Sequence, residues 1–228
     1  MKLIRFFTDK KSEMLGTPKP TKQTIPQWYK HAESTFIAED GSESAGLKKC
    51  MPYVDVMMSG YVLTVPVDIH VSKNDDGTLR ISYDETVLGE FIHERPASLG
   101  HTMPRPYGFA PNHLAYRSHW GWSVPKGFSV LVTHPFNRVD LPFHTVSALM
   151  DSDEFFASGN IPFFIRQDFE GVIEAGTPIA QLIPVKRENW KMIENDQSLI
   201  PKAAYQGKVA RDSRYGYKKV MWHRKEYN

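Results

Sequence analysis

At 228 residues, the chain is long enough for one large domain or for a domain with an elaborate extension, and for a real hydrophobic core. Its 41% hydrophobic, 12% aromatic and 24% charged residues are ordinary for a globular protein, and its net charge of +2 gives no bulk electrostatic case for nucleic-acid or membrane binding. The single cysteine, Cys50, excludes an intrachain disulfide and a cysteine-rich zinc site, and no apolar run approaches the roughly 20 residues of a membrane helix, so we expect a soluble, cytoplasmic protein without a membrane partner.

Residues 1–53 are expected to form an irregular N-terminal segment that wraps around a β domain. A first strand is predicted at residues 2–7. Three prolines and many lysines make residues 8–27 irregular, and a short helix is predicted over residues 27–31 because a proline precedes it. Residues 38–48 have the composition of an exposed loop.

A β pattern begins at Val54, and residues 54–190 are predicted to form one mostly antiparallel β domain. Residues 61–72 are rich in β-branched side chains, and Pro66 places part of this run at a sheet edge or bulge. Residues 79–83 alternate apolar and polar side chains. An Asp-Gly pair lies between the two runs, so the sequence predicts a β-hairpin here.

The rest of the β domain contains an insertion near residues 90–123 that is rich in histidine and aromatic side chains. Further strands, bounded by Gly, Pro or Asp, are predicted at residues 128–133, 143–150, 161–165 and 171–185. A short helix is expected over residues 187–193, and residues 191–228 form a basic C-terminal arm.

Four short segments occur in a suggestive order. They are Ser59-Gly60-Tyr61-Val62-Leu63, Pro125-Lys126-Gly127, Leu149-Met150-Asp151-Ser152-Asp153 and Gly176-Thr177-Pro178-Ile179-Ala180-Gln181-Leu182. They resemble, in that order, motif one, the strand before motif two, motif three and motif four of the dUTPase and dCTP-deaminase superfamily of β-clip enzymes. The resemblance covers roughly a third of the chain. The chain also resembles uncharacterised proteins of tailed phages, although no motif carries that second likeness.

The family resemblance implies a mostly β fold, a dUTPase-like β-clip or distorted β-barrel, with an irregular N-terminal extension and a short C-terminal helix or arm. It also implies self-association, with a trimer favoured, and an active site between subunits that takes a nucleotide or a similar small anion. Mg²⁺ is implied only if the protein is a nucleotide enzyme; otherwise the cofactor is unknown. A phage origin would place the protein in the host cytoplasm or the virion.

The motif positions depart from the family at several polar contacts. The family's phosphate-binding Arg-Ser is Pro135-Phe136 here, and Val62, Glu154 and Pro178 replace the Asp of motif one, the Tyr of motif three and the Arg of motif four. At matching positions only Asp151 and Gln181 remain. The residues that the resemblance connects with the fold are therefore matched better than those that it connects with catalysis.

Two carboxylates are the candidate catalytic groups. By the resemblance, Asp151 would contact a sugar or act as a base, with Asp153 beside it. The alternative is that the Asp-Ser-Asp sequence only forms a turn held by Asx hydrogen bonds. Gln181 is a candidate ligand contact, but inside an apolar strand a structural amide is the favoured interpretation.

Three further residues are candidate ligand contacts. His134 and Arg138 could replace the lost phosphate contacts, since an Arg fork suits a phosphate; a surface salt bridge between Arg138 and Asp140 is the alternative. Tyr215 lies in a faint echo of the family's C-terminal arm, whose aromatic residue stacks on a base. The same basic, aromatic arm could bind nucleic acid, whereas packing on its own or a neighbouring subunit is the favoured role.

The histidines suggest a metal, but none of the nine stands in a His-x-His or His-x-x-x-His pair beside a carboxylate, so no metal site is assigned. Hydrogen-bonded histidines in aromatic loops are favoured for His93, His101, His113 and His119.

Three functions remain open. The preferred one is a divergent, non-catalytic dUTPase-like binding or structural module, and dUTP hydrolysis is not expected. The alternatives are a nucleotide hydrolase or deaminase that uses Asp151 in an inter-subunit pocket, and a metal-dependent oxygenase-type enzyme that uses histidines of residues 90–144.

Overall fold

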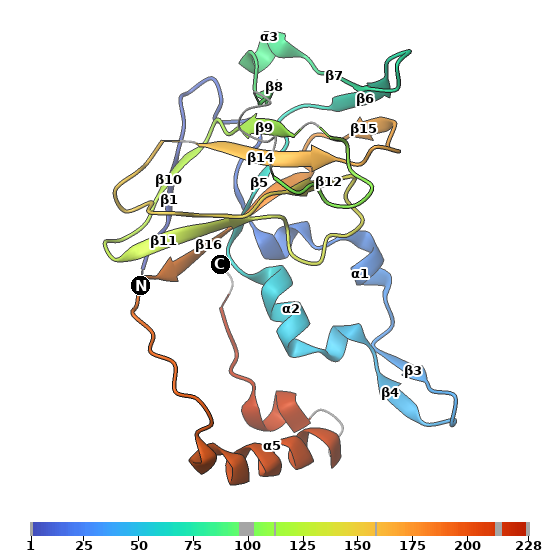
Figure 1. Ribbon diagram of the computed structural model, residues 1–228, viewed down its shortest axis with the longest axis vertical. Coiled ribbons are helices and arrows are strands. Elements are labelled where there is room, and N and C mark those ends of the chain that lie inside the picture. The colour runs from blue at the N-terminus through green and yellow to red at the C-terminus, as the bar shows by residue number, and fades with distance from the viewer. Residues whose placement is uncertain (1, 96–102, 112, 158, 213–215, 227–228) are drawn as a thin grey trace. The chain divides into compact units, whose positions relative to one another are not determined.

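The structure is a computed structural model that describes residues 2–95, 103–111, 113–157, 159–212 and 216–226 (Figure 1). Its strands form five small sheets, so the expected mostly β fold is confirmed. The chain divides into two compact units. The first, called the β unit here, comprises Met1–Thr24 and Gly60–Arg187, and the second comprises Ile25–Ser59 and Glu188–Asn228.

A five-stranded antiparallel sheet is the largest in the β unit. Its order is β13 (Ala148–Met150), β11 (Phe128–Thr133), β16 (Pro178–Lys186), β5 (Tyr61–Thr64) and β2 (Lys19–Pro20). Figure 1 shows β11 and β16 side by side over most of their length. β16 tolerates Pro184, which has no N–H, because its pairing with β5 ends at Leu182, so only β11 flanks the strand at Pro184.

Three smaller sheets complete the β unit. One has the order β12 (Phe143–Thr145), β14 (Asn160–Ile165), β9 (Leu114–Arg117) and β8 (Ile92–Glu94), the next has β15 (Gly171–Ile173), β6 (Ile69–Lys73) and β7 (Leu79–Ser82), and the last pairs β1 (Arg5–Phe7) with β10 (Gly121–Ser123). β6 and β7 confirm the expected hairpin, and Gly77 in its turn has a φ of 80°. The expected strand at residues 61–72 is interrupted around Pro66, between β5 and β6. A short helix, α3 (Glu85–Leu88), starts after Asp84, whose side chain accepts the N–H of Thr86.

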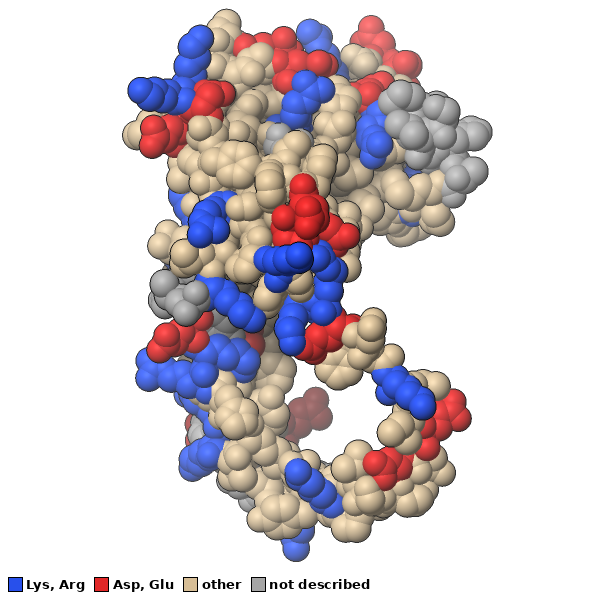
Figure 2. Space-filling view, turned by 90° about the vertical axis from the view of Figure 1, so that its left-hand side faces the viewer, with Lys and Arg blue, Asp and Glu red and all other residues tan. Residues whose placement is uncertain are grey.

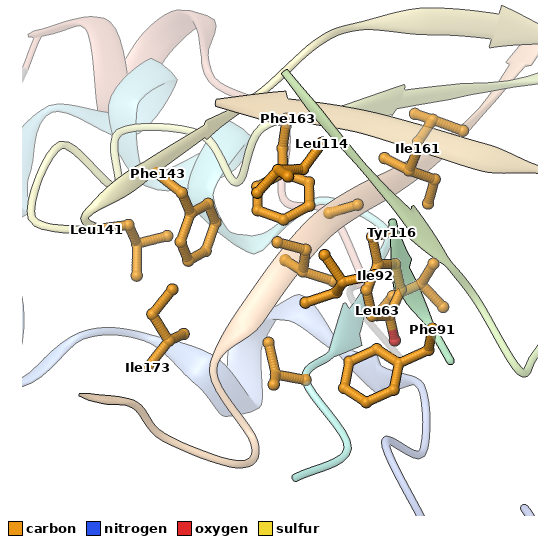
Figure 3. Close-up of a cluster of buried hydrophobic side chains, with 14 of the residues drawn as sticks. Leu63, Phe91, Ile92, Leu114, Tyr116, Leu141, Phe143, Ile161, Phe163 and Ile173 are labelled. Atoms are coloured by element: carbon orange, nitrogen blue, oxygen red, sulfur yellow. The ribbon is translucent and has the colours of Figure 1, made fainter. Parts of the chain in front are cut away.

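One hydrophobic core joins these sheets. Figure 3 shows part of it, and strands of both larger sheets contribute side chains to the cluster. Phe143 and Phe163 meet edge to face, with 6.2 Å between ring centroids. The buried Tyr116 hydroxyl donates to the Thr64 carbonyl oxygen at 3.2 Å, so its polar tip is satisfied.

The second unit contains most of the helices. Its elements are the helices α1 (Gln27–His31), η2 (Leu47–Lys49), α2 (Met51–Met58), η3 (Gln197–Leu199), α5 (Ile200–Asp212) and η4 (Tyr217–Met221), with the strands β3 (Thr35–Ile37) and β4 (Glu43–Ala45). Tyr29 stacks on Tyr53, and Asp55 accepts hydrogen bonds from Trp222 and Lys225. The Tyr29–Tyr53 stack lies within residues 25–59, and the bonds to Asp55 join the unit's two chain segments, which are far apart in sequence.

Several expectations for this unit are wrong. The β pattern was expected to begin at Val54, but residues 51–58 are helical, because Pro52 suits a first helical turn and the apolar run buries Met51 and Met57. The expected loop at residues 38–48 contains the turn of the β3–β4 hairpin and η2. The expected helix at 187–193 is absent from these described residues, and a longer helix follows at α5 instead.

The compact units also differ from the division at residues 53 and 190 that the sequence suggested. Residues 1–24 belong to the β unit because β1 and β2 pair with β10 and β5. Residues 25–59 group with the C-terminal arm instead.

Candidate functional site

All four family-like segments meet in the five-stranded sheet. β5 carries the echo of motif one, β11 begins directly after Gly127, β13 leads into Asp151, and β16 carries motif four. Gly127 and Gly176 both have a φ of 84°, a conformation that L side chains adopt only with strain. The two turns that precede the strands therefore depend on glycine.

Both candidate catalytic carboxylates lie at the start of β11, where Arg187 binds them. Arg187 Nη1 donates to Asp151 Oδ1 at 3.1 Å and to Asp153 Oδ1 at 2.8 Å, and its Nη2 also contacts Asp153. Ser129 Oγ donates to Asp151 at 2.7 Å, and the Gly127 N–H donates to Asp153 at 2.8 Å. We call these five residues the Arg187 cluster. Figure 2 shows acidic and basic side chains adjoining on the face where β16 ends.

The two carboxylates differ in how much they are engaged. The Asp153 side chain is 1% exposed, and the hydrogen bonds from Arg187 and the Gly127 N–H hold its pKa at about 2. Asp151 has a side chain that is 66% exposed, and its Oδ1 accepts the bonds from Ser129 and Arg187. Asp153 is thus a structural anion, whereas Asp151 still presents an oxygen to solvent.

Arg187 also joins two strands. Its N–H donates to the Gly127 carbonyl at 2.9 Å, and its Nη1 donates to the Phe128 carbonyl at 3.0 Å. The guanidinium therefore fixes the end of β16 to the start of β11. Sequence reasoning missed Arg187, because its place opposite the Asp-Ser-Asp turn depends on the pairing of β11 with β16.

His134 lies at the other end of β11 and holds a loop in place. The Thr145 N–H donates to His134 Nδ1 at 3.3 Å, so the proton of the neutral ring is assigned to Nε2, which lies 3.1 Å from the Arg138 carbonyl oxygen. The pKa of His134 is lowered to about 4, mainly by burial and in smaller part by neighbouring His144, against a raising effect of the hydrogen bond to the Arg138 carbonyl. The ring is neutral at pH 7, and both of its nitrogens are used.

Gln181 supports the same loop from β16. Its side chain is fully buried, and its Oε1 accepts the Phe136 N–H at 2.9 Å. The loop at Pro135 and Phe136 is therefore held through its backbone by the Gln181 side chain, and Pro135 is buried. This is the structural role that the sequence favoured for Gln181.

Arg138 makes the salt bridge that was its alternative interpretation. Its Nε and Nη2 donate to Asp140 at 2.9 and 2.8 Å, in a forked geometry. Arg138 also lines a cavity of about 920 Å³, which we call the Arg138 cavity. The other polar or aromatic residues that line it are Lys73, Tyr107, Phe109, His134, Asn137, Phe143, His144, Arg166, Gln167 and Asp168.

The Lys and Arg side chains that line the Arg138 cavity are each paired with an acid. Lys73 pairs with Glu170 at 3.4 Å and Arg166 pairs with Asp168 at 2.7 Å, so each cation along its wall also has an acidic neighbour. An anionic ligand would compete with these carboxylates, and the aromatic side chains could cover a planar group. Lys73 and Arg166 come from segments that the sequence did not connect with Arg138.

The structure places the described site residues in two groups: Asp151 with Asp153, and Gln181, His134 and Arg138 around the loop after β11. Ser129, which binds Asp151, and His134 are five residues apart on an extended strand, so about 17 Å separates them at roughly 3.4 Å per residue. Tyr215 lies outside the described residues. Asp151 and the Arg138 cavity therefore form two separate surfaces.

Four of the described histidines have ring neighbours. His113 packs on Phe164, His119 on Phe91, and His134 on His144. The expected hydrogen bonding is missing at His93 Nδ1 and His119 Nε2, which are buried with no hydrogen-bond partner among the described residues. Among the described residues, no group of three His, Cys, Asp or Glu side chains could hold a metal ion. His101 lies outside the described part of the chain.

No described helix is both long and apolar enough to cross a membrane. The basic residues Lys202, Lys208, Lys218 and Lys219 of the C-terminal arm are exposed. Their proposed contact with nucleic acid stays a prediction.

Comparison with known proteins gives a structural likeness only. No protein-family model and no curated protein matches the chain. Among solved structures, it is similar to a mutant dUTPase from phage phi11 of S. aureus, whose structure concerns a structural Mg(II) ion, at 14% identity and a TM-score of 0.29, covering 47% of this chain and 97% of that one. A second structure of the phi11 dUTPase matches at 14% identity and a TM-score of 0.26, covering 48% and 99% of the two chains.

The dUTPase of Staphylococcus bacteriophage 80alpha, with dUpNHpp, matches at 13% identity and a TM-score of 0.26, covering 46% of this chain and 88% of that one. TM-scores this low do not assign a fold family or an activity.

Proposed function

We propose that this chain is a divergent dUTPase-like β-clip protein that acts as a non-catalytic binding or structural module. One observation carries the proposal: the four family-like segments are neighbours in one sheet, while the acidic side chains of motif three are bound by Arg187. The motif-like strands lie next to one another as the resemblance implies. Asp151, the carboxylate that would have to position the attacking water, is bound by Arg187 and Ser129 and so helps to hold these strands together.

The residues at the other motif positions support a loss of catalysis. Phosphoryl-transfer catalysis depends on holding the phosphates and neutralising their charge. The side chains of Pro135 and Phe136 cannot donate a hydrogen bond, and Val62 is buried within the sheet. Losing even one donor of this kind typically lowers a rate by about 10²–10³-fold.

The Arg138 cavity supports a binding role, with a nucleotide or another small anion as the ligand. Its cations and aromatic side chains suit a planar anion, and its volume of about 920 Å³ is large enough for a nucleotide. Self-association, with a trimer favoured, follows from the family resemblance, as does residence in the host cytoplasm or the virion if the protein comes from a phage. Sedimentation that finds only a 26.1 kDa species at micromolar concentration would contradict the assembly.

Asp151 is the observation that favours the second candidate, a nucleotide hydrolase or deaminase, because its side chain is 66% exposed. The test measures pyrophosphate release from dUTP, and ammonia release from dCTP, with Mg²⁺ present. We expect background rates for the wild type and for Asp151→Asn alike. Turnover above background that disappears in Asp151→Asn would overturn the non-catalytic proposal.

Binding is tested separately by thermal shift with dNTPs, since a ligand that binds only the folded state raises the melting temperature. We expect a shift that Arg138→Gln abolishes and that Arg80→Gln leaves unchanged, because exposed Arg80 does not line the cavity. Unchanged melting temperatures at millimolar dNTP would contradict nucleotide binding and leave only a structural role.

A further inference from the structure

A second cavity, of about 360 Å³, lies beside the β6–β7 hairpin. It is bounded by the hairpin turn and β7 on one side and by the ends of β8, β9 and β14 on the other. It shares only Gln167 with the Arg138 cavity. We call it the Glu94 cavity, and nothing in the proposed function uses it.

The floor of the Glu94 cavity is apolar. Leu79 and Ile81 are half-buried residues on one face of β7, where successive side chains alternate between faces. Leu114 and Ile165 belong to the hydrophobic core and also line the cavity. The intervening Arg80 is exposed and is not part of the lining. An apolar ligand group would therefore meet a surface that is already anchored in the core.

The rim of the Glu94 cavity is acidic. Asp76 and Glu94 line it together with neutral polar side chains, and no Lys or Arg is among the described residues that line it. The Thr78 hydroxyl and N–H donate to Asp76 Oδ1 at 2.6 and 2.9 Å, and they hold the pKa of that carboxyl below its usual value. Asp76 is therefore ionised at pH 7, in a position fixed by the turn.

Glu94 supplies a second negative charge with no competing partner. No ion pair or hydrogen bond of its side chain occurs among the described residues, in contrast to the paired cations of the Arg138 cavity. Its place at the end of β8, in register with Leu114, puts the carboxylate next to the apolar floor. A cation at this rim would gain a partner without displacing one.

We propose that the Glu94 cavity binds a small organic cation with an apolar body, such as an aromatic or aliphatic primary amine. The apolar body lies on Leu79, Ile81, Leu114 and Ile165, where its burial from water favours binding. The ammonium group lies at the rim between Asp76 and Glu94. Two like charges repel an anion and leave its charge unpaired, so the cavity selects against carboxylates and phosphates.

The experiment uses the full chain and three probes of similar size and different charge: phenethylamine, phenethyl alcohol and phenylacetate. Binding is followed by methyl NMR, because shifts of the Leu79, Ile81, Leu114 and Ile165 methyl signals locate the ligand. We expect saturable, millimolar binding of phenethylamine, with the alcohol about tenfold weaker and phenylacetate not bound. Shifts at these four residues are the expected signature.

Two variants change only the charge. Asp76→Asn keeps an oxygen that can accept the Thr78 bonds, and Glu94→Gln keeps the length of the side chain, so neither should unfold the hairpin. Each is expected to weaken phenethylamine binding severalfold, and the double variant should bind it no better than the alcohol. Glu85→Gln, at an exposed acid of α3 outside the cavity, is the matched control and should bind like the wild type.

Three results would overturn the proposal. One is the absence of saturable shifts at these methyl groups. Another is equal affinity for the amine and the alcohol. The third is unchanged amine binding in the double variant. None of these outcomes depends on nucleotide binding in the Arg138 cavity, which the dNTP experiment measures separately.

Discussion

Gln181→Leu tests whether the glutamine of motif four supports the loop or serves a ligand. In the structure its buried Oε1 accepts the Phe136 N–H at 2.9 Å. Leucine has a similar volume but no acceptor, so the substitution leaves the Phe136 N–H without this bond. The backbone of the loop after β11 then loses one of the contacts that fix it.

The expected cost is worked from the loss of the bond to the Phe136 N–H. An unsatisfied, largely buried N–H costs about 1–3 kcal/mol, and a better apolar fit of leucine can offset part of this. For a domain of about 150 to 250 residues, each kcal/mol lowers the melting temperature by about 2–4 °C. We therefore expect Gln181→Leu to melt about 2–12 °C below the wild type with no ligand present.

The assay is thermal unfolding followed by circular dichroism, with hydrogen exchange at the Phe136 amide as a local readout. Gln23→Leu is the control, because it makes the same chemical change at an exposed position of the β unit and should alter stability by at most about 0.5 kcal/mol. A variant that melts with the wild type, and whose Phe136 amide exchanges no faster, would refute the structural role of Gln181.

Arg187→Met should raise the pKa of Asp153 from about 2 toward its ordinary value of 3.8. The wild type should therefore be more stable than the variant by a difference that is full above about pH 4 and shrinks as pH falls toward 2. Urea unfolding from about pH 2 to 6 measures this difference, and a difference that does not change with pH would contradict the prediction. The ring of His134 should titrate near pH 4 in the folded protein, as measured by NMR. The free energy of unfolding should fall as pH drops from about 6.5 toward 4, because the ring gains its proton first in the unfolded state. A titration midpoint near 6.5 in the folded protein would contradict burial as the cause of the lowered pKa. Gly176→Ala should cost about 1–2 kcal/mol by urea unfolding through backbone strain alone, since φ is 84° and an added Cβ meets nothing within 4 Å; an unchanged midpoint would show that this turn can shift.

Local signals in the sequence predicted the strands better than the helices. The Asp-Gly turn and the short Gly- and Pro-bounded runs gave the β6–β7 hairpin, β11 and most of β16. Residues 51–58 misled because alternating valines resemble a strand, whereas the observed helix buries Met51 and Met57 through tertiary contacts. Proline at the first turn was the available signal for both α2 and α5.

The candidate site was less predictable, since its geometry depends on pairing between distant segments. The alternatives weighed for Arg138 included its bond with Asp140, because the two residues are close in sequence. Arg187 lies 36 residues from Asp151, and nothing local connects them. The Arg138 cavity likewise combines Lys73 and Arg166 with a loop from another sheet.

The surviving motif residues can be explained by packing without any chemistry. A sheet is held mainly by backbone hydrogen bonds, so Val62 can occupy a motif position without disturbing β5. Gln181 cannot change as freely, because a buried N–H depends on it, and Asp153 cannot, because an N–H and Arg187 both depend on it. Gln181, one of the two polar contacts at matching positions, is therefore a residue whose loss would cost stability. The other, Asp151, accepts bonds from Ser129 and Arg187 but has a side chain that is 66% exposed. A match at a position such as that of Gln181 is an argument for the strand arrangement, and only a polar group without a structural partner would be an argument for catalysis.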